Sequence, residues 1–156
     1  MSKVKVSASI SIDGFGAGPQ QSLENPQGVG GLALAEWVFP TRSFQRMHRK
    51  DWTVQGIHDK DGGTTFHFVT DGIHRALERA IATANGKDVG IGGIATVQQY
   101  LRAGLIDELQ LAIAPVLLGS GERLLGDIDL VKLGYTCTEH VAGERALHVV
   151  LRRHAT

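Results

Sequence analysis

The chain has 156 residues, and its 16 basic and 16 acidic side chains cancel in net charge. A chain of this length can bury about 70% of its unfolded surface, so we expect one domain over residues 1–156 without disulfide staples. The hydrophobic content of 42% is ordinary for a globular protein, and no run approaches the roughly 18 apolar residues of a membrane span. The basic stripe of a general nucleic-acid binder is missing. We therefore expect a small-molecule partner, no nucleic acid and no membrane.

The single cysteine and the N-terminal residues both favour a cytoplasmic location. One cysteine, Cys137, excludes an internal disulfide framework, and Met1 leads directly into a strand-like pattern without a signal-peptide apolar region. Cys137 lies between threonines in a β-like run. This setting favours a structural role over a catalytic thiol.

The N-terminal part begins with a strict alternation. Apolar residues take the even positions of Val4–Ile12 and lysine or serine the odd ones, which predicts a strand. Three glycines and a proline within Asp13–Gln20 then predict a loop at the C-terminal edge of that strand. Residues Leu34–Met47 are compatible with helix on either side of a break at Pro40, and Met47–Gly63 is predicted to be loop.

The middle of the chain alternates between strand and helix patterns. Residues 64–70, "TTFHFVT", predict a short strand, and apolar spacing predicts a helix within 71–86. A short strand over 87–93, a helix over 94–104 and a long strand over 106–118 follow. A strand-helix-strand unit with this spacing predicts two parallel strands joined by a crossover.

The C-terminal residues change character. A glycine-rich turn over 119–125 is followed by strand-like runs over 135–141 and 146–153, which predict an antiparallel hairpin. The sheet is therefore expected to be mixed. No repeat or linker interrupts the pattern, so the predicted fold class is α/β, one sheet with helices on its faces.

Two adjacent glycines, Gly92 and Gly93, stand where the strand over 87–93 turns into a helix. Backbone amides at a helix start favour anions, and residues without Cβ atoms let a phosphate approach them. Tight packing of the helix on the strand is the alternative explanation. Gly90, Gly92 and Ala95 match a dinucleotide fingerprint. The acidic residue that should end the next strand stands before it, which argues against a Rossmann fold.

Three other patterns in the sequence contain residues that can take part in chemistry. Residues 119–126 resemble a phosphate loop but lack its lysine-hydroxyl ending, so Glu122 and Arg123 are expected to be solvated or to line a cleft. The seven histidines show no metal-ligand spacing, and no metal site is predicted. Asp13, at the edge of the first strand, is well placed to contact a substrate, with ordinary Asp-Gly turn chemistry as the alternative.

Taken together, "SASISIDGFGAGP", "FHFVTDGIHRALERA", the block from Val89 to Leu125 and the closing hairpin resemble the dihydrofolate reductase-like superfamily. The resemblance is to the reductase half of riboflavin-biosynthesis deaminase-reductases. It implies a three-layer α/β/α domain with a mixed, mostly parallel sheet, usually paired as a homodimer. Such a domain binds NADPH and reduces a heterocyclic or otherwise conjugated small molecule by hydride transfer.

The resemblance also assigns residues. It implies that Asp13 is the catalytic residue, near the nicotinamide and the substrate, and that the cofactor carries the chemistry while the protein orients it. It implies that the NADPH-binding residues are Ala8, Gly14, Gly92, Gly93, Ile94, Ala95 and Thr96.

One segment departs from the family pattern. Relatives hold a further strand, a turn, a helix and another strand where this chain has only the short interval of about residues 47–63. The chain can be a degenerate paralogue, can use a partner subunit for the missing part, or can lack residues of a longer protein between Met47 and Gly63. The first two explanations keep an alternative function open, a non-catalytic small-ligand-binding or dimeric scaffold domain.

Overall fold

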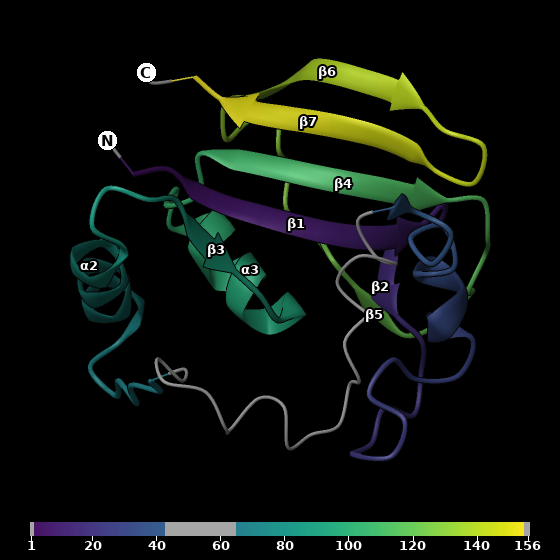
Figure 1. Ribbon diagram of the computed structural model, residues 1–156, viewed down its shortest axis with the longest axis horizontal. Helices are drawn as coiled ribbons and strands as arrows, with labels where there is room; N and C mark the ends of the chain where they lie inside the picture. The colour runs from purple at the N-terminus through teal and green to yellow at the C-terminus, as the bar shows by residue number, and fades with distance from the viewer. Residues whose placement is uncertain (1, 43–64, 155–156) are drawn as a thin grey trace.

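The alternating N-terminal segment forms a central strand of a five-stranded sheet (Figure 1). The computed structural model describes residues 2–42 and 65–154, so the interval over 47–63 lies outside the described residues. The strands of this sheet are β1 (Val4–Ser11), β3 (Val89–Ile91), β4 (Glu108–Ala114), β6 (Tyr135–Ala142) and β7 (Leu147–Arg153). Their order is β3-β1-β4-β7-β6.

The predicted mixed sheet is confirmed. Strand β1 pairs in parallel with β3 on one side and with β4 on the other. Helix α3 (Ile94–Arg102) joins β3 to β4, which is the predicted crossover. Strands β6 and β7 form the predicted antiparallel hairpin, and β7 also pairs antiparallel with β4.

The apolar core lies between the sheet and two helices. Helices α2 (Ile73–Ala84) and α3 contribute Leu77 and Leu101 to one cluster that also holds Val6 of β1 and Leu109 of β4. Because side chains alternate along a strand, the even positions of β1 face these helices. The odd positions, which carry serines beyond Lys5, therefore face the other side of the sheet.

The region after residue 30 differs from the predicted helix. A short 3-10 helix, η1 (Gly31–Leu34), is followed by turns to Pro40, and the rest of the predicted span lies largely outside the described residues. Gly28 and Gly30 have positive φ values of 70° and 75°, which favour turns. Trp37 follows η1 and packs on the face of the sheet away from α3, where its Nε1 donates to Ser9 Oγ at 3.0 Å.

Two segments predicted as loop or turn pair with each other. Strands β2 (Phe15–Ala17) and β5 (Glu122–Arg123) form a short antiparallel ladder, visible beside η1 in Figure 1. Their partners lie more than 100 residues apart in the chain, so no local pattern indicates the pairing. A Cβ atom at Gly121 would overlap the carbonyl oxygen of Ala17, so glycine is required there for the two segments to approach.

The strand predicted over 64–70 is wrong for the described residues. Residues 65–70 form no strand, and the side chains of Phe66 and Phe68 are 72% and 92% exposed. Aromatic residues favour strands only where a neighbouring strand and a buried face are present. Within the described part of the chain, no helix is long and apolar enough to cross a membrane.

Candidate active site between β1 and the start of α3

Strands β1 and β3 separate halfway along β1. Their ladder ends with the pair Val6 and Ile91, whereas the ladder between β1 and β4 continues to Ser11 and Ala114. Beyond Val6, no strand among the described residues pairs with this edge of β1. The chain thus leaves a crevice at the carboxyl ends of parallel strands, where open α/β sheets bind ligands.

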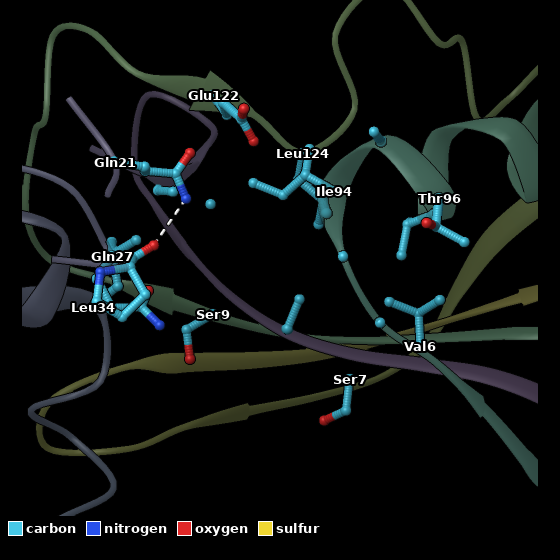
Figure 2. Close-up of a pocket in the computed structure, with 18 of the residues that line it drawn as sticks. Val6, Ser7, Ser9, Gln21, Gln27, Leu34, Ile94, Thr96, Glu122 and Leu124 are labelled. Atoms are coloured by element: carbon cyan, nitrogen blue, oxygen red, sulfur yellow. Dashed lines mark hydrogen bonds between the residues drawn. The ribbon is translucent and has the colours of Figure 1, made fainter. Parts of the chain in front are cut away.

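A cavity of about 760 Å³ occupies this crevice (Figure 2). Its floor comes from β1 between Val6 and Ser9, and its opposite wall comes from the turn between β3 and α3. The remaining walls belong to β2, β5, the loop over residues 21–27 and the end of η1. The volume lies in the range of small-molecule and cofactor sites.

The turn into α3 presents free backbone amides to the cavity. Gly93 is the N-cap residue of α3, has a φ of 82° and can supply no side-chain cap. The first intrahelical bond runs from the Val97 amide to the Gly93 carbonyl, so the amides of Ile94, Ala95 and Thr96 precede the hydrogen-bonded ladder. A Cβ atom on Gly92 would meet no atom within 4 Å. Open space therefore lies in front of a helix start whose dipole favours an anion.

The side of the cavity opposite the start of α3 is polar. Gln21 donates from Nε2 to the Pro26 carbonyl at 2.8 Å, which holds its carboxamide in the wall shown in Figure 2. Gln27 and Glu122 line the same side. Glu122 is the one charged side chain among the described residues that line the cavity. The sequence left open whether Glu122 is solvated or lines a cleft, and the structure places it, exposed, at the rim.

Asp13 and Gly14 follow the end of β1 and hydrogen-bond to the chain on either side of β5. The Asp13 carboxylate accepts the amide of Leu118 at 3.2 Å and that of Gly119 at 2.8 Å. A hydrogen bond from the Ser11 hydroxyl, together with these amides, lowers the pKa of Asp13 to about 2. Gly14, with a φ of 86°, accepts the Leu124 amide through its carbonyl at 3.1 Å. Asp13 thus joins the end of β1 to the segment that leads into β5, and Gly14 joins it to the residue that follows β5.

The residues assigned from sequence thus fall into two groups. Six of the assigned cofactor-binding residues line the cavity, namely Ala8, Gly92, Gly93, Ile94, Ala95 and Thr96. Asp13 and Gly14 are not among the lining residues, and they hydrogen-bond to Gly119 and Leu124 on either side of β5. Sequence reasoning did not single out Gln21 and Gln27, since an irregular loop carries no periodic signal; the glycines before them were the only indication.

Part of the cavity lies within a match to a known protein family. The chain matches the family described as the RibD C-terminal domain over residues 35–149. It belongs to that family. The matched span of this RibD C-terminal domain includes β3, the glycine pair and the start of α3, which form one wall of the cavity, and it continues through β4. The resemblance noted in the sequence is therefore confirmed.

Solved structures share the fold of this RibD C-terminal domain at low identity. A pyrimidine reductase-like protein from Corynebacterium diphtheriae has a TM-score of 0.58 and 12% identity, over 99% of this chain and 93% of that one. A diaminohydroxyphosphoribosylaminopyrimidine deaminase/5-amino-6-(5-phosphoribosylamino)uracil reductase from Thermotoga maritima has a TM-score of 0.61 and 9% identity, over 97% of this chain and 56% of that one. Dihydrofolate reductase from Enterococcus faecalis, complexed with NADP(H), has a TM-score of 0.51 and 15% identity, over 98% and 97%. No curated protein sequence matches the chain.

Proposed function

We propose that this chain is a reductase that binds NADPH in the cavity between β1 and α3 and directs a hydride to a small heterocyclic or conjugated acceptor. The observation that carries the proposal is the uncapped start of α3, where Gly92 and Gly93 open onto a cavity of about 760 Å³. Membership of the RibD C-terminal domain family and neighbours named as reductases support the same class.

The residues present fit the pyrophosphate of a dinucleotide. The space beyond Gly92 is open, and α3 has nine residues, enough for its dipole to act at its first amides. A phosphate there would accept hydrogen bonds from the amides of Ile94, Ala95 and Thr96 without crossing a side chain. Among the described residues, the lining offers no lysine or arginine, so this backbone is the anion-binding element that the described chain supplies.

In the proposed reaction, the protein orients the cofactor. NADPH, when bound, supplies the hydride. The amides at the start of α3 would hold its phosphates, and Ala8 with the unpaired edge of β1 would contact the rest of the cofactor. Glu122 accepts hydrogen bonds from hydroxyl groups and repels phosphates, which keeps the phosphates on the α3 side.

The assignments of Asp13 as catalytic and of Gly14 as cofactor-binding stay predictions. Since both carboxylate oxygens of Asp13 accept backbone amides, a direct contact with substrate would have to compete with the bonds to Leu118 and Gly119. We propose that Asp13 acts on the site by holding the loops that form its walls.

Assembly and location also stay predictions. The proposed homodimer is compatible with β6, an edge strand on which every residue after Tyr135 is exposed. Light scattering of the purified chain measures the mass of the particle directly. Fractionation of the producing cell tests the cytoplasmic location.

Isothermal titration of the full chain with NADPH, and separately with NADH, tests the proposal. Saturable binding of NADPH at one site per chain is the expected result. If a folded sample binds neither NADPH nor NADH, the proposal is rejected and the non-catalytic ligand-binding or scaffold alternative is favoured. Turnover of NADPH with an added acceptor, lost when Gly92 is blocked, would exclude that alternative.

A further inference from the structure

A second cavity, of about 500 Å³, lies beside helix α2 at the edge of the sheet. Strand β3 is the outermost strand on this side, and no described strand pairs with it on the side away from β1 (Figure 1). The cavity is bounded by α2, by the start of β3 and by the segment that precedes α2. It shares no lining residue with the cavity proposed for NADPH, so it is a separate site.

The apolar part of the lining comes from all three segments. Ala76, Ala80 and Ala84 stand on one face of α2, because residues four apart lie above one another along a helix. Val69 comes from the segment before α2, and the buried Val89 comes from the start of β3. No phenylalanine, tyrosine or tryptophan is among the described lining residues. This wall therefore favours an aliphatic chain rather than a planar ring.

Arg79 places a positive charge beside the apolar wall. Its Nη2 atom donates to His67 Nδ1 at 2.8 Å. A guanidinium group can only donate, so the His67 ring carries its proton on Nε2, and Arg79 keeps further donors for an anion. Among the described residues, no carboxylate forms an ion pair with Arg79, whereas Arg75, one turn earlier on α2, is paired with Glu78 at 2.8 Å.

The acidic residue of the lining is already paired with a cation. The Asp88 carboxylate accepts the Lys5 ammonium group at 2.7 Å and the Lys3 amide at 3.0 Å. The hydrogen bond from Lys5, together with that amide, lowers the pKa of Asp88, so the pair stays ionised at neutral pH. Within the described part of the lining, Arg79 thus carries the one charge that has no opposite charge beside it.

We propose that this cavity is a second ligand site and that it binds an aliphatic monocarboxylate. The carboxylate accepts hydrogen bonds from the Arg79 guanidinium, and the hydrocarbon chain lies along Ala80, Ala84 and Val89. A dicarboxylate would place its second charge against the apolar wall, which selects for a single charge. The site goes beyond the proposed reductase function and does not depend on it.

The test uses octanoate and octanamide, which have the same hydrocarbon chain and differ in the charge of the head group at neutral pH. Ligand-observed NMR titration of the full chain gives the Kd of each. We expect octanoate to bind about tenfold more tightly, because its hydrogen bonds to Arg79 are charge-assisted on both sides. In Arg79→Gln this preference disappears. The matched control is Arg75→Gln, on the same helix and outside the cavity, which keeps the preference.

The variant Val69→Ser tests the apolar wall separately. Val69 lines the cavity but is not part of the main apolar core, so the variant is expected to fold. We expect octanoate and octanamide both to bind about fivefold more weakly, with the preference for octanoate kept, since the variant removes apolar contact from both ligands. Unchanged Kd values in this variant would contradict the proposed position of the hydrocarbon chain.

Equal Kd values for octanoate and octanamide in the wild-type chain would overturn the proposal. A preference that survives in a folded Arg79→Gln variant would also overturn it. Amide chemical-shift changes in the labelled wild-type chain give a test that needs no variant. We expect octanoate to shift the amides of Val69, Arg79 and Thr83, which belong to the lining. Changes confined to the start of α3 would overturn the proposal, because the anion would then lie in the cavity proposed for NADPH.

Discussion

The Asp13 carboxylate accepts the Gly119 amide at 2.8 Å, and this bond joins two loops that are 106 residues apart in the sequence. The Arg123 guanidinium supports the same junction, because it donates to the Asp13 carbonyl at 2.6 Å and stacks over the Phe15 ring at 4.4 Å. The ends of β1 and β4 are therefore tied to β2 and β5. These short strands form one wall of the larger cavity.

Replacement of Asp13 by Asn tests this tie. Asparagine keeps the size of the side chain but offers one acceptor in place of two, so one amide of Leu118 and Gly119 loses its partner. We expect the exchange of that amide with solvent to quicken by about tenfold. Hydrogen exchange followed by NMR measures it. Unchanged exchange together with lost activity would instead support Asp13 as a substrate contact.

The ionisation of Asp13 links this junction to pH. The pKa of the folded carboxyl is lowered from 3.8 to about 2 by the Ser11 hydroxyl and the two amides. Since the folded pKa lies below the unfolded one, the contribution of Asp13 to stability is complete above pH 3.8 and is lost as the pH falls through about 2. An NMR titration of the Asp13 carboxyl carbon is expected to show a midpoint near 2. A midpoint at the ordinary value would contradict the hydrogen bonding described.

Sequence pattern predicted the elements that have a periodic, locally complete signal. The alternation of Val4–Ile12 and the apolar spacing of α2 and α3 each reflect one buried face, which a short window contains. The pairing of β2 with β5 could not be predicted, because the two segments are far apart in the sequence. The aromatic residues Phe66 and Phe68 led to a wrong strand prediction for a similar reason, since a strand also needs a neighbouring strand.

The sequence likewise predicts only part of the candidate site. Gly92 and Gly93 were found because a glycine pair between strand and helix has a local physical meaning. Gln21 and Gln27 carry no such signal, because they lie in an irregular loop. They line the cavity because this loop folds back beside β2, where the Gly18 amide donates to the Gln27 carbonyl at 2.9 Å.

A valine at position 92 tests the anion site without straining the backbone. Gly92 lacks the positive φ of Gly93, and its Cβ would enter the open space where we place a phosphate. We expect Gly92→Val to weaken NADPH binding at least about tenfold with an unchanged Tm. Gly90→Val is the matched control, since a Cβ there also meets nothing within 4 Å and lies outside the cavity. Equal affinities in the two variants would favour tight packing as the reason for the glycine pair.

A leucine of α3 tests the core on which the site stands. Leu101 is 0% exposed within the main apolar cluster. We expect Leu101→Ala to lower the free energy of unfolding by about 2–5 kcal/mol, because it removes buried surface and leaves a void. Leu117→Ala, at a position 72% exposed, is expected to change it by less than about 0.5 kcal/mol. Urea unfolding of both variants provides the comparison, and similar losses would contradict the burial described.

The most direct test of NADPH binding at the start of α3 is the map of amide chemical-shift changes when isotopically labelled full-length protein is titrated with NADPH. We expect the largest changes on the amides of Gly93, Ile94, Ala95 and Thr96, with smaller changes along β1 from Ser7 to Ser9. Changes that leave the start of α3 untouched and gather elsewhere on the chain would contradict it.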